Sequence, residues 1–457
     1  MPTRRQFLAV SGASMGSALV APPVFARQRG NEPIPGERPP RCEGVTVKSP
    51  ALRVPVGLII DDSTCLVNLA HFAIPQFAEV FPKNYKQDWR RLPREIPDAF
   101  VRKFADWCRG HGVKGKYSIV PYPACVGWVD REMPGWSRAD LLQSVKVAQS
   151  LADSWDFHPE MVTHTRIIDL KTGRPYPEAS ERFMENWGWT DGKSADEIGA
   201  YMAYALGMLK NAGFPCEGIT TPGGFGNRAL GSLSLGNLQA CRDIFRAEIP
   251  HYFRHLFIDD RSVAPRVEYA RGIAGPDPES SVSIIGCTGD WFGGWDGLER
   301  PALERLITAD GKGGRLPQVI ARGEPAIIVC HWPGLYCNGD EIGFTIFQKA
   351  VERLEAHHRN IVWMKLSEVA RYWAARELTR IDRTPAGLRL HAPFSAPNFT
   401  LAFSGAPAKI SGGGKETSPQ EVASANKLRA GTFWRSGARS TLCFDLPKGA
   451  TTIEFAG

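Results

Sequence analysis

Several residues whose side chains can do acid–base or metal chemistry come directly after apolar, β-branched runs. Asp61 and Asp62 follow VPVGLII, His164 follows EMVT, Thr221 follows EGIT, and His331 follows AIIVC. Two adjacent carboxylates repel each other unless a cation or a proton neutralises one of them, so this pair suits a metal site with a neighbouring base. Histidine can bind a metal or transfer a proton near neutral pH. The pattern therefore indicates acid–base or metal-assisted chemistry.

Each of these residues also fits a purely structural role. An Asp–Asp pair often starts a turn, and a single histidine at a strand end is often held by ordinary hydrogen bonds. Their shared placement favours chemistry, because the active site of a parallel barrel forms where the strands end.

The elements that must position these residues alternate along the chain. Short apolar or β-branched runs cover residues 54–61, 116–122, 157–165, 217–222, 281–289, 326–332 and 361–366. Helical patterns lie between them at 98–109, 138–152, 194–211, 238–247 and 345–357, and Ser194 with Glu197 forms a capping box. This alternation predicts an α/β fold, and the lack of a Gly-x-Gly-x-x-Gly turn after the first run favours a barrel over an open sheet. We expect a (β/α)7–8 barrel-like main domain over residues 51–375.

The segments on either side of this domain differ from it in composition. Residues 376–457 hold alternating runs such as GLRLHAP and STLCFDL between Pro and Gly clusters, which predicts a small β-rich, sandwich-like domain. Residues 27–50 are rich in Pro, Arg, Gly and Glu, which is typical of an extended linker.

The motifs at the strand ends resemble those of the polysaccharide deacetylases. Ile59-Ile60-Asp61-Asp62-Ser63 is similar to the first motif of that family, and the segment 160–165, EMVTHT, is similar to the second. Thr221-Pro222-Gly223 resembles the third motif around its proline, and Val329-Cys330-His331 resembles the last strand. The four resemblances occur in order over residues 51 to about 370. They imply a divergent member of the glycoside hydrolase and deacetylase barrel superfamily.

The chain departs from the family pattern at two places. The second metal-binding His of the family falls four residues after the first, where this chain has Ile168, so Asp169 or His158 is the expected substitute. The Arg that precedes the third-motif proline in the family is replaced by Thr220 and Thr221.

The resemblance implies a role for each residue. Asp62 and His164, with Asp169 as third ligand, would hold a divalent metal, Asp61 would act as general base and His331 as general acid. A mixed carboxylate and imidazole set with an open position points to zinc.

Other polar and aromatic residues after the strands are candidates for substrate binding. Trp332 and Trp291 could stack on sugar rings, although tryptophan more often fills a core. Thr221 and Asp290 complete this set of candidates, and Asp290 could also serve as an acid or base.

The chain starts with the pattern of an export signal. Arg4 and Arg5 precede an apolar stretch that runs to Val20, and Val24-Phe25-Ala26 offers small residues at the spacing of a cleavage site. Residues 1–26 are therefore predicted to be a twin-arginine signal peptide. We expect the chain to use the twin-arginine export machinery and to act in the periplasm or outside the cell. The apolar stretch is shorter than the roughly 20 residues of a membrane-spanning helix, so no span is expected in the mature chain.

Charge and cysteine usage exclude other classes of protein. The net charge of +7 is spread over 457 residues without a run of Lys or Arg beyond the signal, which disfavours nucleic-acid binding. No Cys-x-x-Cys or Cys/His spacing indicates a zinc finger, and Cys216, Cys287 and Cys330 lie within or beside apolar runs as buried thiols would.

The sequence leads to one function and two alternatives. The first is an exported, metal-dependent hydrolase that removes N- or O-acyl groups, such as acetyl, from a carbohydrate. The second is a glycoside hydrolase that uses carboxylates only, for example Asp61 with Asp290 or Glu217. The third is a non-catalytic glycan-binding barrel.

Overall fold

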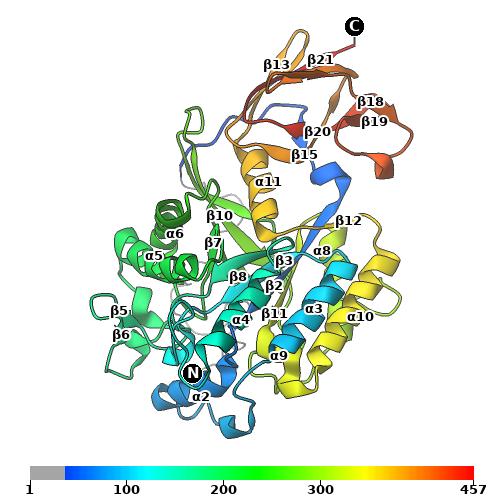
Figure 1. Ribbon diagram of the computed structural model, residues 1–457. Coiled ribbons are helices and arrows are strands. Elements are labelled where there is room, and N and C mark those ends of the chain that lie inside the picture. The colour runs from blue at the N-terminus through cyan, green and yellow to red at the C-terminus, as the bar shows by residue number, and fades with distance from the viewer. Residues whose placement is uncertain (1–35, 457) are drawn as a thin grey trace, which may run out of the picture.

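The computed structural model describes residues 36–456 (Figure 1). The predicted signal peptide, residues 1–26, and the first part of the predicted linker lie outside the described residues. Within the described part, no helix has both the length and the apolar character needed to cross a bilayer. All ten cysteines of the sequence lie in this part and are free thiols, and Cys216, Cys287 and Cys330 are buried as expected.

A parallel sheet in the order β11-β2-β3-β4 carries most of the predicted chemistry, and β12 also pairs with β2. Its strands are β2 (Val54–Asp61), β3 (Gly115–Ile119), β4 (Trp155–Pro159), β11 (Ala326–His331) and β12 (Ile361–Trp363). Every residue of β2 is buried, which explains why its sequence is a continuous apolar run rather than an alternating one. The register places His331 beside Asp61 at the end of the sheet.

A second sheet has the order β7-β8-β10-β9. Its strands are β7 (Gly218–Thr220), β8 (His251–Leu256), β10 (Glu279–Gly286) and β9 (Arg266–Arg271), and only the pairing of β9 with β10 is antiparallel. The sequence did not predict β8 or β9, because HYFRHL and RVEYAR carry charged and imidazole side chains among their apolar residues.

The two sheets meet at both edges through isolated contacts. A single parallel bridge joins Glu160 to Thr220, and the amide of Cys287 donates to the carbonyl of Ile327 at 2.8 Å. Neither junction is a ladder of paired residues. The parallel strands of the predicted barrel are thus present, but they do not form one closed sheet.

Helices follow most of these strands and cover the sheets (Figure 1). They are α2 (Leu69–Val80), α3 (Asp98–Gly110), α4 (Arg138–Gln149), α5 (Ala195–Asn211), α6 (Leu230–Phe245), α7 (Leu303–Leu306), α8 (Arg315–Ala321), α9 (Trp332–Tyr336), α10 (Ile342–His357) and α11 (Leu366–Leu378). The predicted capping box of Ser194 and Glu197 starts α5. A short hairpin, β5 (Ile168–Asp169) and β6 (Arg174–Pro175), precedes this helix.

The C-terminal part consists of two five-stranded sheets. One contains β1 (Thr46–Val47), β15 (Ala396–Ser404), β20 (Arg439–Leu446), β19 (Thr432–Ser436) and β18 (Gln420–Val422). The other contains β13 (Arg380–Thr384), β14 (Gly387–Ala392), β21 (Gly449–Phe455), β16 (Pro407–Gly412) and β17 (Lys415–Thr417). Side chains of both sheets, such as Leu390 and Phe444, belong to one buried cluster. The strands of the predicted β-rich region are therefore present.

The boundaries predicted for this region differ from the structure in two ways. Residues 46–47 of the predicted linker form β1, which pairs with β15. The predicted boundary between residues 375 and 376 falls inside α11, whose Tyr372 hydroxyl donates to the carbonyl of Lys48 at 2.7 Å and packs its ring on Phe399. Composition cannot reveal either contact, because both join segments that are far apart in the sequence.

Candidate active site

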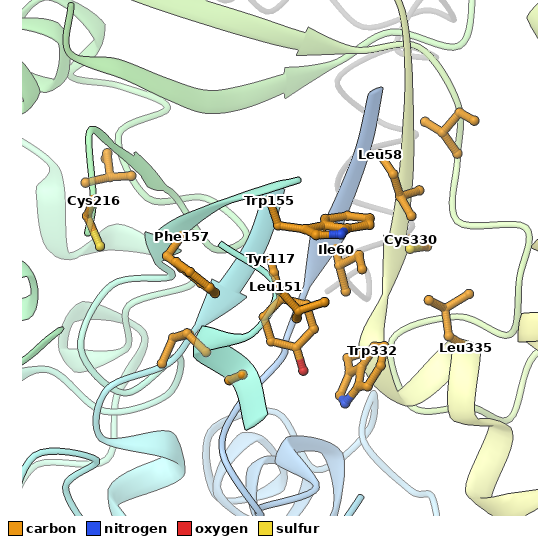
Figure 2. Close-up of a cluster of buried hydrophobic side chains, with 14 of the residues drawn as sticks. Leu58, Ile60, Tyr117, Leu151, Trp155, Phe157, Cys216, Cys330, Trp332 and Leu335 are labelled. Atoms are coloured by element: carbon orange, nitrogen blue, oxygen red, sulfur yellow. The ribbon is translucent and has the colours of Figure 1, made fainter. Parts of the chain in front are cut away.

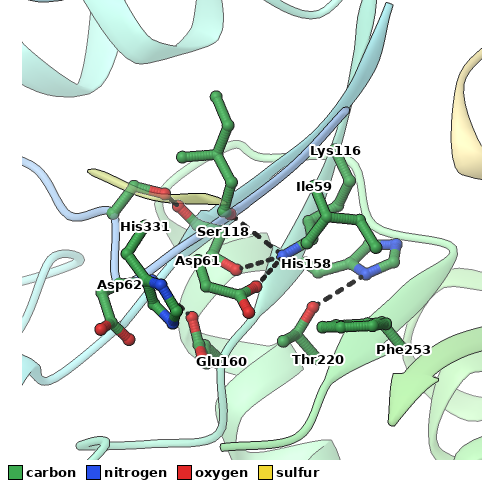
Figure 3. A network of polar contacts seen from close by, with 12 residues as sticks. Ile59, Asp61, Asp62, Lys116, Ser118, His158, Glu160, Thr220, Phe253 and His331 are labelled. Carbon is green, nitrogen blue, oxygen red and sulfur yellow. Dashed lines mark hydrogen bonds and ion pairs between the residues drawn. The ribbon is translucent and has the colours of Figure 1, made fainter. Parts of the chain in front are cut away.

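Several carboxylates and histidines gather at one edge of the first sheet, and Figure 3 shows Asp61, Asp62, Glu160 and His331 there. Asp61 ends β2, Glu160 follows β4, and His331 ends β11. Asp61, Asp62, Glu160, His164 and His331 are at most 4% exposed. Carboxylates and imidazoles at this depth need charged or hydrogen-bonded partners, which makes this group the candidate active site.

The centre of the group is a triad of Asp62, Glu160 and His164. The Nε2 atom of His164 lies 2.7 Å from Asp62 Oδ1 and 3.3 Å from Glu160 Oε1. The amide of Asp62 donates to Glu160 Oε2 at 2.7 Å, which fixes the second carboxylate against the first. One ligand atom from each residue lies within 4.8 Å of the others, so the triad can hold a metal ion.

Electrostatics in the triad favour a cation. Burial acts to raise the pKa of Asp62, but the charges of His164 and His331, together with the hydrogen bond from His164, outweigh it and the pKa is lowered. Burial acts to lower the pKa of His164, but Asp62 and Glu160 raise it to about 10. The two carboxylates thus stabilise positive charge at His164 Nε2, and a bound metal ion would meet the same need.

The conformation of the loop that carries His164 depends on Glu185, a carboxylate that the sequence did not predict. Glu185 accepts hydrogen bonds from the amides of Val162, Thr163 and His164, and from the hydroxyl of Tyr201. Burial raises the pKa of Glu185 to about 7 although these donors oppose the rise. Residues 160–165 therefore form a loop instead of the predicted strand end, and His164 adopts a positive φ of 63° within it.

The general base candidate is paired with a buried lysine. Lys116, on β3, donates from Nζ to Asp61 Oδ1 at 2.6 Å, to Ser118 Oγ at 2.7 Å and to the carbonyl of Ile60 at 3.0 Å. Asp61 and Lys116 are both fully buried. The lysine compensates the charge of Asp61 and fixes its orientation.

His331 and Asp290 form a second pair at this edge. Nδ1 of His331 lies 2.6 Å from Asp290 Oδ2, and Asp290 Oδ1 accepts the amide of Phe292 at 3.1 Å. This carboxylate orients the ring and stabilises its protonated form, as expected beside a general acid. Asp290, predicted to bind substrate, is thus engaged with His331.

Two other predicted site residues lie elsewhere or have structural roles. Asp169 lies in the β5–β6 hairpin, where its carboxylate accepts the amide of Lys171, and it does not join the triad. The structure therefore does not bring Asp169 to Asp62 and His164, and the side chain that lies beside these two residues is Glu160. Thr221 is buried and donates its hydroxyl to the carbonyl of Phe253 at 3.2 Å, which ties β7 to β8.

The two tryptophans predicted to stack on sugar are packed into the protein. Trp332 is 1% exposed, and its ring centroid lies 4.8 Å from that of Phe100 and 5.2 Å from that of Tyr117 (Figure 2). Trp291 is buried beneath the guanidinium of Arg305, 4.4 Å from the ring centroid. These contacts contradict a stacking role. Trp332 is packed in this way because α9 begins at this residue and its ring meets Phe100 and Phe104 of α3.

Because Trp332 is a core residue, we expect Trp332→Ala to destabilise the fold. Removal of a fully buried tryptophan costs about 3–5 kcal/mol in the free energy of unfolding. Urea denaturation of the variant and the unmodified chain measures this difference. A loss below about 1 kcal/mol together with weaker glycan binding would instead support the stacking role.

A second group of histidines lies further down β4. His158 Nε2 is 3.0 Å from His251 Nε2 on β8, and Asp156 Oδ2 is 4.0 Å from the same atom of His251. Burial lowers the pKa of His158 well below its usual value and lowers that of His251 to about 4. Both rings are therefore neutral near pH 7.

The depressed pKa of His251 predicts a loss of stability in mild acid. The unfolded chain takes up this proton near the usual pKa of about 6.5, before the folded protein does. The contribution of neutral His251 to the free energy of unfolding is therefore complete above about pH 6.5. It is lost as the pH falls toward 4, by up to about 3 kcal/mol. Urea denaturation at pH 7.5, 5.5 and 4.5 in the presence of a chelator measures this trend. In His251→Asn, the free energy of unfolding should depend less on pH between 7.5 and 4.5. The same dependence in the variant and the unmodified chain would show that His251 is not the group responsible.

Comparisons with known proteins give no family. No protein-family model and no curated protein sequence matches the chain. Among solved structures, a GH30 endoxylanase from Clostridium papyrosolvens shares 10% identity and a TM-score of 0.28, over 91% of this chain and all of its own. An endo-β-1,6-glucanase shares 9% identity and a TM-score of 0.30, over 90% of this chain and 93% of its own. Because both TM-scores lie below 0.5, neither likeness establishes a shared fold or function.

Proposed function

We propose that the chain is an exported, metal-dependent hydrolase that removes acyl groups from a carbohydrate. The observation that supports this proposal most strongly is the buried triad of Asp62, Glu160 and His164 beside the Asp61–Lys116 and His331–Asp290 pairs. These groups provide a metal-ligand set, a base and an acid at one edge of a parallel sheet, which is where active sites of such folds form.

The triad fits a divalent metal by its chemistry. Carboxylate oxygen and imidazole nitrogen are both zinc ligands, and three protein ligands leave the fourth position open, as in catalytic zinc sites. Without a metal ion, a proton on His164 supplies the positive charge beside the two carboxylates. Metal binding would displace this proton. Asp62, Glu160 and His164 would hold the ion.

The reaction adds water across an acyl C–N or C–O bond, which frees a carboxylic acid and an amine or hydroxyl. When bound by Asp62, Glu160 and His164, a divalent cation would supply Lewis-acid activation of the water and the acyl carbonyl. Asp61, held by Lys116, takes the proton of the attacking water. His331 donates a proton from Nε2 to the leaving nitrogen or oxygen, while Asp290 at Nδ1 supports the charged ring.

An aromatic group next to the triad supports a carbohydrate as substrate. The ring of Phe77 lies 6.5 Å from that of His164 and 5.2 Å from that of Trp187. Trp187 and Phe81 pack on each other at 4.7 Å and are only half-buried, so they retain surface that a sugar ring can contact. These two residues take the place of Trp332 and Trp291 as candidates for stacking.

Release of acetate from acetylated oligosaccharides tests this function. The chain is stripped with a chelator and assayed before and after addition of zinc, with the same zinc in buffer as a blank. We expect acetate release only from the zinc-loaded protein. Equal release with and without chelator would contradict a metal-dependent reaction.

A carboxylate-only glycoside hydrolase is the second candidate, and the presence of two buried carboxylates side by side favours it. Oxygen atoms of Asp62 and Glu160 lie within 4.8 Å of each other, and glycoside hydrolases use a pair of carboxyl groups at the scissile bond. The partner named from the sequence, Glu217, is exposed and precedes β7 at the opposite strand end from Asp61. New reducing ends formed in the presence of chelator would favour this candidate, and glycan affinity without turnover would favour a binding barrel.

Export through the twin-arginine pathway is the part of the proposal that rests on residues 1–26 alone. Replacing Arg4 and Arg5 by lysine keeps the charge but removes the arginine pair, so we expect the precursor to remain in the cytoplasm. Immunoblots of cytoplasmic and periplasmic fractions from a twin-arginine-competent host measure this. Unchanged processing would contradict twin-arginine export.

A further inference from the structure

The inner face of β4 carries a second set of metal-ligating side chains. Residues 156, 158 and 160 alternate with Phe157 and Pro159, so their side chains share one face of the strand. Glu160 belongs to the triad, whereas Asp156 and His158 form a separate group with His251 of β8, in which both histidines are buried and Asp156 is half-buried. Ligand atoms of these three residues lie within 4.8 Å of one another. The mechanism proposed for the strand ends uses none of the three.

The second ring nitrogens of both histidines face oxygen atoms. His158 Nδ1 lies 3.4 Å from Thr220 Oγ1, and His251 Nδ1 lies 3.3 Å from the carbonyl of Ile249. Figure 3 shows the contact of His158 with Thr220. Metal-bound histidines usually donate from the other ring nitrogen to such an oxygen, which fixes the tautomer. If both rings carry their proton on Nδ1, their Nε2 lone pairs point at each other across 3.0 Å, an arrangement that a cation between them stabilises.

The spacing is close to that of a zinc site. With Zn–N bonds of about 2.0–2.1 Å, two nitrogen ligands of a tetrahedral zinc lie about 3.3 Å apart. The observed 3.0 Å between the two Nε2 atoms needs only a small outward rotation. Asp156 Oδ2, at 4.0 Å from His251 Nε2, must approach by less than an ångström. The glycine at position 218 leaves the room for the His158 ring, since a Cβ there would lie 2.7 Å from Nε2.

We propose that Asp156, His158 and His251 form a second site for a divalent cation of the zinc class, with a structural role. This inference goes beyond the proposed hydrolase and does not depend on it. Asp156 accepts the amide and hydroxyl of Ser367, in the first turn of α11, at 2.6 and 2.8 Å, and its Oδ1 lies 4.0 Å from Lys365 Nζ. A cation bound to the other face of this carboxylate would join β4, β8 and the start of α11, the helix that leads to the C-terminal sheets.

Binding requires one change in the ring protons. In the metal-free network, His158 can donate from Nε2 to His251 Nε2 and accept the Thr220 hydroxyl at Nδ1. On metal binding, that proton moves to Nδ1, where Thr220 Oγ1 accepts it, and both Nε2 atoms ligate the ion.

Zinc content per chain tests the proposal. The chain is stripped with a chelator, reloaded with zinc, desalted and measured by elemental analysis. We expect His251→Gln and His158→Gln to bind one zinc fewer than the unmodified chain. His255→Asn is the matched control, because this histidine lies on the same strand but outside the group, and it should bind as much zinc as the unmodified chain.

The same experiment separates this site from the triad. Asp62→Asn combined with His164→Gln should lose one zinc and keep the other, and adding His251→Gln should remove both. Equal zinc content in the unmodified chain and in both single histidine variants would overturn the second site, whatever the triad does. If the histidine variants fail to fold, Thr220→Val serves instead, with an expected 10- to 100-fold weaker affinity for the retained zinc in the Asp62/His164 background. Unchanged affinity in that variant would also overturn the proposal.

Discussion

Asp62→Asn is expected to lose the metal of the triad and to lower acetate release by about 10²- to 10⁴-fold. Asn removes the charge that faces His164 Nε2 at 2.7 Å but keeps nearly the same shape. Glu160 and His164 alone bind a divalent ion weakly, and loss of the ion removes several kcal/mol of transition-state stabilisation. Acetate release and metal content measured on the same sample give the result.

Three other variants show whether this effect is specific. Asp61→Asn and His331→Ala should keep the metal and lower turnover by roughly 10²- to 10⁴-fold, which is the usual contribution of a general base or acid. Asp169→Asn is the control, since its carboxylate lies in the hairpin outside the triad and should affect neither quantity. Full metal content in Asp62→Asn would contradict a role of Asp62 as a metal ligand.

Lys116→Met is expected to destabilise the fold by about 3–5 kcal/mol and to suppress activity. Both members of the Lys116–Asp61 pair are fully buried, so loss of the cation leaves an uncompensated carboxylate in the interior. A carboxylate in that position favours the protonated form, so the acid limb of the pH–activity profile should move to higher pH. Urea denaturation and a pH–activity profile measure the two effects.

The double variant Asp61→Asn/Lys116→Met is the matched control for this pair. It leaves no buried charge without a partner, so it should recover most of the stability while remaining inactive. Equal destabilisation in the single and double variants would mean that Lys116 acts by packing alone. An unshifted pH profile in Lys116→Met would contradict its role in positioning the base.

The strands that carry Asp61 and His331 could be predicted from the sequence because burial on both faces leaves a clear signal. β2 and β11 are buried at every position, and their apolar runs end at the two polar residues. β8 has no such signal, because His251 and Arg254 point into buried polar contacts. The single bridge between Glu160 and Thr220 depends on how the two sheets meet, which periodicity cannot show.

The ligand set was predicted only in part. Asp62 and His164 are brought together as expected, but the third member of the triad is Glu160, four residues before His164. The Glu-x-x-x-His spacing was visible in the sequence, yet a strand was expected there, and in a strand it would not have brought the two side chains to one point. The loop forms because Glu185 binds three consecutive amides, and no local pattern links residue 185 to residue 163.

The burial of Lys116 and Trp332 could not be predicted from their local sequence. A lysine within an apolar run suggests a solvated edge, but here Asp61 on the neighbouring strand makes its burial possible. A tryptophan directly after a predicted catalytic histidine suggests a binding surface, but α9 turns it into the core against Phe100 and Phe104. Both outcomes depend on partners supplied by other elements.

The metal content of the reconstituted chain is the measurement that tests whether the triad binds a metal ion. The unmodified protein and the Asp62→Asn/His164→Gln variant are stripped, reloaded with zinc and analysed side by side, after circular dichroism has shown that both are folded. We expect the unmodified chain to bind one zinc more than the variant, and acetate release to follow this difference. Equal zinc content in the two proteins would contradict a metal site at the triad, and with it the proposed metal-dependent hydrolase.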